Sequence, residues 1–114
     1  MSNFRIGNVV CRKHDYGQEE VVITEDNINE EFSGIPISVQ NLVKILGFTI
    51  TTFYTDISRP VEEIMYEAGD QIIRYKPHGE FAFEIDGIAK FNIGTIHQLQ
   101  NIIQDLIGYG MVHV

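Results

Sequence analysis

The sequence contains one cysteine, no tryptophan, and only 8 lysine and arginine residues against 16 aspartate and glutamate residues. Because Cys11 has no second cysteine to pair with, no intramolecular disulfide can form, and packing alone must hold the fold together. The formal net charge of −8 repels phosphate backbones and anionic lipids. Direct binding to nucleic acid or to a membrane surface is therefore disfavoured.

Long apolar runs are also missing. No segment approaches the roughly 20 consecutive apolar residues that cross a bilayer, and the first residues lack the apolar stretch of a signal peptide. We therefore expect a cytoplasmic protein. Hydrophobic residues nevertheless make up 44% of the 114 residues, and 7 Phe and 5 Tyr provide large core side chains. This composition and length predict a single domain over residues 1–114.

The first third of the chain predicts a β-hairpin followed by a loop. Residues 9–13 and 20–24 are rich in β-branched side chains and are separated by the turn signal Asp15-Tyr16-Gly17. The pair Gly7-Asn8 indicates a bend or bulge just before the first strand. Residues 25–34 are acidic and predict a loop.

Residues 38–46 predict a short helix. Ser38 is suited to the N-cap, and Gly47 is suited to the left-handed residue that follows a helix. Between them, apolar residues recur at helical spacing. They are Val39, Leu42, Val43 and Leu46. A helix of this length depends on docking its apolar side.

Residues 48–93 predict an antiparallel meander. Short β-type segments cover residues 48–54, 61–67, 71–75, 80–85 and 88–93. Hairpin signals fall between them, at 56–60, 69–70, 77–79 and 86–87. Asp86-Gly87 is the strongest of these signals, because a type I′ turn needs positive φ at both central residues.

The last long element is predicted to be a helix over residues 95–107. Thr95 and Gln98 have the spacing of a capping box, and Gly108 ends the helix. The apolar stripe, which we expect to be buried, is Ile96, Leu99, Ile102, Ile103, Leu106 and Ile107. Together these patterns predict an α+β fold, with an antiparallel sheet of about four to six strands and two short helices packed on it.

No grouping of residues predicts catalysis or metal binding. The four histidines are dispersed, and Cys11 with His14 is the only closely spaced pair of metal-binding types. Motifs that cradle phosphate are absent. His97 could act as a base, but its position in a helix start favours a surface or packing role. We therefore predict no catalytic residue, no metal, no cofactor and no enzymatic activity.

Acidic residues gather in two clusters. Residues 15–31 hold seven acids and no Lys or Arg, namely Asp15, Glu19, Glu20, Glu25, Asp26, Glu30 and Glu31. A second cluster is Asp56, Glu62, Glu63, Glu67 and Asp70, with only Arg59 among them. Such runs are commonly solvated surface, and the alternative is a face that binds a basic partner. We take the first cluster as the candidate partner-binding surface.

Three blocks of the sequence resemble a pattern in small uncharacterised proteins encoded by phages and integrated elements of Bacteroidetes-type bacteria. The blocks are Phe4-Arg5-Ile6-Gly7-Asn8, Gly34-Ile35-Pro36-Ile37 leading to Leu46-Gly47-Phe48, and Ile96-His97-Gln98-Leu99-Gln100-Asn101 leading to Leu106-Ile107-Gly108. The acidic residues 15–31 and the tail after Gly108 depart from the pattern. The resemblance implies a mobile-element origin, a bacterial host cell, and no known enzyme activity.

This origin and the charge lead to a functional hypothesis. Small acidic phage-encoded domains are often inhibitors that occupy a basic surface of a host defence protein, so we expect an anti-CRISPR-like inhibitor of an RNA-guided nuclease. A rival is a structural or accessory phage protein that assembles with itself through a strand edge or residues 109–114. A third alternative is a small enzyme or ligand-binding domain that uses His97 and nearby carboxylates.

Overall fold

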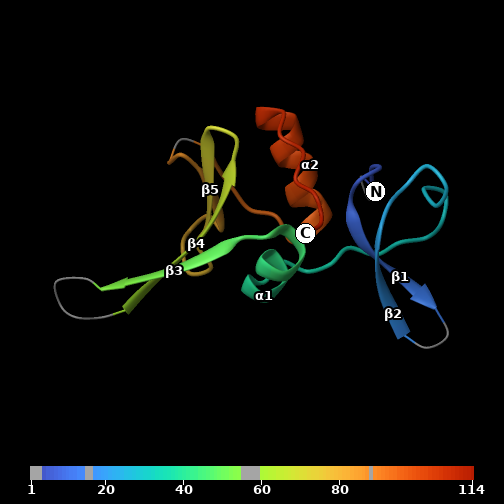
Figure 1. Ribbon diagram of the computed structural model, residues 1–114, viewed down its shortest axis with the longest axis horizontal. Coiled ribbons are helices and arrows are strands. Elements are labelled where there is room, and N and C mark those ends of the chain that lie inside the picture. The colour runs from blue at the N-terminus through green and yellow to red at the C-terminus, as the bar shows by residue number, and fades with distance from the viewer. Residues whose placement is uncertain (1–3, 15–16, 55–59, 88) are drawn as a thin grey trace. The chain divides into compact units, whose positions relative to one another are not determined.

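The computed structural model describes residues 4–14, 17–54, 60–87 and 89–114 (Figure 1). Within these ranges the strands are β1 Val9–His14, β2 Gly17–Val22, β3 Thr49–Tyr54, β4 Pro60–Ala68, β5 Gln71–Tyr75, β6 Phe83–Ile85 and β7 Ala89–Phe91. The helical segments are α1 Val39–Asn41, its π-helical continuation Leu42–Leu46, and α2 Ile96–Ile107. The predicted α+β class is confirmed.

The chain divides into two compact units, each held together by contacts among its own residues. Unit 1 comprises Met1–Leu46 and Ile93–Val114, and unit 2 comprises Gly47–Asn92. Unit 1 holds the two-stranded sheet and both helical segments, whereas unit 2 holds a five-stranded antiparallel sheet. The five strands lie within the expected range of four to six. Independent folding of residues 1–114 as a single domain stays a prediction.

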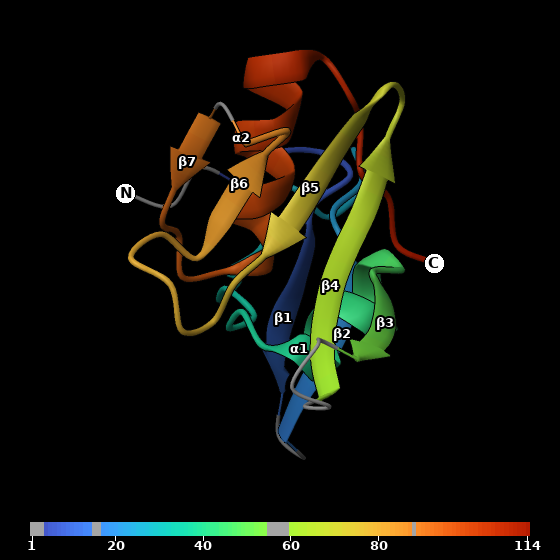
Figure 2. The same cartoon turned by 90° about the vertical axis from the view of Figure 1, so that its left-hand side faces the viewer.

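In unit 2 the strands lie side by side in chain order, from β3 at one edge to β7 at the other (Figure 2). The hairpin signals are confirmed at Gly69, whose φ is 63°, and at Asp86-Gly87, with φ of 51° and 72°. The segment predicted over residues 80–85 is shorter than expected, because only Phe83–Ile85 pairs with β5. The signal at 56–60 lies largely outside the described residues. The buried side chains of the unit include Phe48, Ile64, Ile73, Phe83 and Ile85.

In unit 1 the first predicted helix is confirmed at both ends. The Ser38 hydroxyl accepts a hydrogen bond from the Asn41 amide at 3.0 Å, and Gly47 has a φ of 83°. Between these ends the segment widens into a π-helical turn over Leu42–Leu46, which the spacing of apolar residues did not predict. Leu42, Ile45 and Leu46 are buried, so the segment is docked by its apolar side as expected.

Helix α2 spans Ile96–Ile107, within one residue of the predicted 95–107, but its start differs from the predicted capping box. The Thr95 side chain makes no capping hydrogen bond and pairs instead with His97 Nδ1 at 3.1 Å. Gln98 Oε1 accepts from the Gly94 amide at 3.1 Å rather than from Thr95. The capping box was therefore wrong, because other groups close in the sequence, His97 and the Gly94 amide, bond to both side chains.

The buried face of α2 is also more polar than predicted. Ile96, Leu99 and Ile103 are fully buried, but Leu106 is 53% exposed. Three polar residues share the buried face with the apolar ones, namely His97, Gln100 and Asn101. The expectation that Leu106 lies in the core was therefore wrong. The buried face of α2 is partly polar because buried backbone groups elsewhere in unit 1 find their hydrogen-bond partners on this helix.

Gln100 supplies most of those partners. Its Oε1 accepts from the Val9 amide at 2.8 Å, and its Nε2 donates to the carbonyls of Gly7 at 3.1 Å and Met111 at 3.0 Å. One side chain thus joins the start of β1, the bend before it and the C-terminal tail. Each of these backbone groups would otherwise lie unpaired against the helix.

The three sequence blocks of the resemblance meet around α2. Asn8 Nδ2 donates to Asn101 Oδ1 at 2.9 Å, which joins the first block to the third. The Ile96 amide donates to the Ile35 carbonyl at 2.8 Å, which joins the third to the second. A Cβ atom on Gly34 would lie 2.7 Å from Thr95 Cγ2, so this crossing requires glycine. The blocks therefore have a structural explanation in unit 1.

Candidate protein-binding surface

Four of the seven acids predicted to bind a partner lie on one loop. Glu25, Asp26, Glu30 and Glu31 belong to residues 23–34, which follow β2, and we call this segment the acidic loop. Glu19 and Glu20 precede it on β2. Asp15 lies outside the described residues. Six of the predicted residues thus belong to β2 and the loop that continues it.

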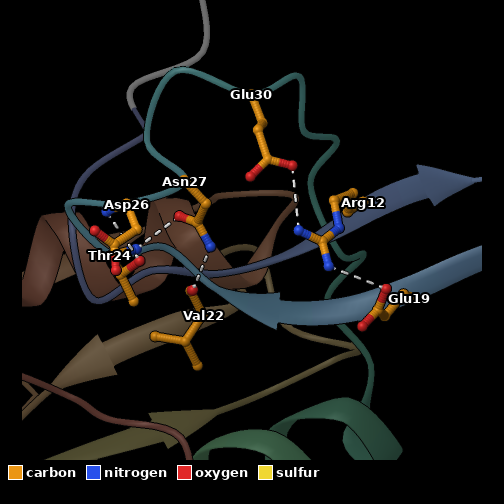
Figure 3. Close-up of polar contacts among 7 residues, drawn as sticks. All are labelled: Arg12, Glu19, Val22, Thr24, Asp26, Asn27 and Glu30. Atoms are coloured by element: carbon orange, nitrogen blue, oxygen red, sulfur yellow. Dashed lines mark hydrogen bonds and ion pairs between the residues drawn. The ribbon is translucent and has the colours of Figure 1, made fainter.

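Arg12 on β1 compensates part of this charge. Its guanidinium contacts Glu19 Oε2 at 3.2 Å and Glu30 Oε1 at 3.1 Å, so it connects β2 to the acidic loop (Figure 3). The hydrogen bond that Arg12 donates to Glu19, followed by the one that it donates to Glu30, raises the pKa of Arg12 above its ordinary value. Although residues 15–31 contain no Lys or Arg, two of their acids therefore have a cationic neighbour in Arg12.

The register of the hairpin explains this pair. Arg12 lies directly opposite Glu19 in the β1–β2 ladder. Directly opposed side chains of an antiparallel pair lie on the same face and within reach of each other. The sequence predicted the hairpin without its register, so it could not place Arg12 beside these acids.

The acidic loop is held in one shape by Asn27. Its Oδ1 accepts from the Thr24 amide at 2.8 Å, and its Nδ2 donates to the Val22 carbonyl at 3.2 Å (Figure 3). The Glu30 amide then donates to the Asn27 carbonyl at 2.9 Å. Together with the contact from Arg12 to Glu30, these bonds fix the loop at both of its halves. Bonds from a side chain to the nearby backbone take the place of the ladder bonds that a loop lacks.

Three acids of the loop remain uncompensated. Glu25, Asp26 and Glu31 are exposed and form no ion pair with any residue in the described ranges. Glu20, by contrast, is hydrogen-bonded to Nε2 of His113 from the C-terminal tail. The exposed side chain of Ile28 lies between the free acids in the sequence and adds an apolar element to the surface.

The second acidic cluster lies in unit 2. Glu62, Glu63 and Glu67 are on β4, and Asp70 is in the turn after it. Glu63 is paired with Arg74 Nε at 2.6 Å, whereas Glu62, Glu67 and Asp70 are exposed without an ion pair to the described residues. Asp56 and Arg59 lie outside the described ranges. This cluster provides matched control positions for the first.

His97 is buried, and the described residues around it form no arrangement that suggests catalysis. It is 5% exposed, and its ring packs on Phe4 with the ring centroids 4.6 Å apart. Burial lowers the pKa of the imidazole below its ordinary value, so the ring is neutral at pH 7. Of the two roles considered for His97, packing fits this environment. For Cys11, burial and then the charge of Glu20 raise the pKa of the thiol, which lowers its reactivity.

The pKa of His97 makes stability depend on pH. Because burial lowers the folded-state pKa, the unfolded chain binds a proton more readily, so stability is retained above the unfolded pKa of about 6.5. It falls as the pH drops through that value toward the folded-state pKa. We expect urea unfolding of the wild type to show this loss, and His97→Gln to lack that part of it. An identical pH dependence in both proteins would contradict the assignment.

Two concave regions of the described part of the chain are lined by polar groups that already pair within the protein. One has a volume of about 420 Å³ in unit 2 and is lined by both charge signs, including Glu63, Arg74 and Lys76. Arg74 and Lys76 are already paired with Glu63 and Glu84. A smaller one of about 190 Å³ in unit 1 lies beside Gln100 and Asn101, whose polar groups bond to the protein itself.

The described residues hold no further candidate site of two common kinds, a metal-binding cluster and a membrane-spanning helix. Across the ranges that the structure describes, no three His, Cys, Asp or Glu residues are placed to hold a metal ion. None of the helices in those ranges has the length and apolar character needed to cross a membrane. No protein family, curated protein or solved structure matches the chain.

Proposed function

We propose that this chain is a protein-binding module whose acidic loop occupies a basic surface of another protein. The observation that carries the proposal is the set of three exposed, unpaired acids on a loop held in one shape, Glu25, Asp26 and Glu31. In its most specific form, inferred from the implied mobile-element origin together with the acidic charge, the partner is an RNA-guided nuclease of a bacterial defence system. Binding there would inhibit the nuclease by covering its basic channel.

The fixed shape of the loop supports binding over mere solubility. A loop that is already ordered loses little conformational entropy when it meets a partner. Arg12 and Asn27 hold the loop without neutralising the three free acids. A surface that only keeps a protein soluble needs charge, but it does not need the charge in a fixed arrangement.

The proposal predicts which acids matter. The triple variant Glu25→Lys, Asp26→Lys and Glu31→Lys reverses the free charges and leaves the contacts of Arg12 intact. We expect its association with the partner to slow by about tenfold or more at about 0.1 M salt, because electrostatic complementarity accelerates encounter. The melting temperature should change little, since these side chains are exposed.

The control is the variant Glu62→Lys, Glu67→Lys and Asp70→Lys. It changes the net charge by the same amount at exposed, unpaired positions of unit 2. Tagged wild-type protein would first capture partners from bacterial lysate, and a purified nuclease with its guide RNA would be tested directly for loss of target cleavage. Association rates of the three proteins would then be measured across a salt series. Equal slowing in both variants, or slowing in neither, would contradict the proposed surface.

A further inference from the structure

Strand β3 forms an edge of the five-stranded sheet. It pairs with β4 on one side, and within the described residues no strand lies on its other side (Figure 2). An edge strand presents unpaired N–H and C=O groups that fit one kind of ligand, an extended chain.

The register identifies the outward-facing residues. Pairs in an antiparallel ladder alternate between those that exchange two hydrogen bonds and those whose backbone groups point away. Pro60 has no N–H and lies opposite Tyr54, so Tyr54 and Pro60 are a pair that does not exchange hydrogen bonds. The alternation makes Thr49 and Met65 a bonded pair, in agreement with the Thr49 hydroxyl donating to the Met65 carbonyl at 3.3 Å. Ile50, Thr52 and Tyr54 therefore point their backbone groups to the free edge.

The side chains of these residues are exposed and uncharged. Ile50 is 46% exposed and Tyr54 is 73% exposed, and neither they nor any other residue of Thr49–Tyr54 carries a charge. Other sheet edges are protected differently. Strand β2 carries Glu19 and Glu20, and β7 is three residues long and carries a lysine. Charges and short length are the usual protections of an edge against pairing, and β3 has neither.

We propose that β3 pairs with β3 of a second copy of this chain, antiparallel around a two-fold axis at Thr52. The exposed apolar side chains on both sides of Thr52 favour a second copy as this occupant. With Thr52 opposite Thr52, Ile50 of each copy lies opposite Tyr54 of the other, so the exposed apolar side chains of the strand cover one another. All three outward residues then exchange backbone hydrogen bonds with their counterparts.

Salt screens the repulsion between the acids that lie nearest to the pairing axis. The acid nearest to the axis in the ladder is Glu62, which lies opposite Thr52. The Glu62 residues of the two copies would be three strand spacings apart, roughly 14 Å, which exceeds the Debye length of about 8 Å at physiological ionic strength. Pairing of one six-residue strand is a small interface, so we expect a dissociation constant in the micromolar range or weaker.

The first test is sedimentation of the full chain from about 1 µM to about 1 mM. The wild type should shift from monomer to dimer, and Thr52→Pro should weaken the dimer at least about tenfold, because each copy loses an edge N–H. Thr52→Val keeps this N–H and should dimerise like the wild type. A wild type that stays monomeric overturns the proposal and leaves the edge to a strand of another protein. Equal dimerisation of the Pro and Val variants also overturns it.

The second test checks the register with two double variants. Ile50→Glu with Tyr54→Glu places like charges opposite each other and should abolish the dimer. Ile50→Lys with Tyr54→Glu places opposite charges together and should keep it. Circular dichroism confirms that both variants are folded. Loss of the dimer in both, or in neither, overturns the proposed pairing.

Discussion

Leu99→Ala is expected to lower the free energy of unfolding by about 2–5 kcal/mol, whereas Leu106→Ala should cost less than about 1 kcal/mol. The substitution and the helix are the same, but Leu99 is 0% exposed and Leu106 is 53% exposed. Truncating Leu99 removes fully buried apolar surface and leaves a cavity, while truncating Leu106 removes much less buried surface and leaves no enclosed cavity. Periodicity alone had placed both in the core.

Urea unfolding followed by circular dichroism compares the two variants with the wild type. An equal m-value in all three proteins would show that the change in midpoint reports stability. Similar losses for Leu99→Ala and Leu106→Ala would mean that the helix presents a different face to the core.

Gln100→Ala should destabilise unit 1 by about 2–4 kcal/mol, because it leaves three backbone groups without their partner. These are the Val9 amide and the carbonyls of Gly7 and Met111. Buried unpaired groups lose the energy of hydration without regaining it inside the protein. The loss would rival that of a core leucine although the side chain is polar.

The matched control is Gln104→Ala, one helical turn later on α2. Gln104 is exposed, so its truncation should change stability by no more than about 0.5 kcal/mol. Unfolding by urea and hydrogen exchange of the Val9 amide would both report the difference. Fast exchange at Val9 in the Gln100→Ala variant alone is the specific sign of the lost bond. Unchanged protection there would contradict the assigned role.

Elements governed by neighbouring residues could be predicted from the sequence. The turn at Asp86-Gly87 follows from the backbone freedom that positive φ demands, and the start of the first helix follows from the Ser38 hydroxyl. The bounds of α2 were predicted to within one residue, since the apolar period and Gly108 define them. In each case the decisive interaction spans only a few residues.

What depended on distant residues could not be predicted. Burial of Gln100 and Asn101 requires knowing that backbone and side-chain groups from the start of the chain meet α2. Thr95 had the right spacing for a cap but bonds to a histidine that the fold has buried. For the candidate site, the acids were identifiable by composition, but the compensation of Glu19 and Glu30 by Arg12 depends on strand register.

The division of the chain has a consequence for the order of folding. Unit 2 is one continuous segment, whereas unit 1 combines both ends of the chain. The contact between Asn8 and Asn101 closes a loop of 93 residues, and such closures cost more entropy and form later than hairpins between neighbours. On the ribosome, residues 47–92 emerge before α2 and can form their hairpins first. Folding is thus expected to finish where the two ends of the chain meet.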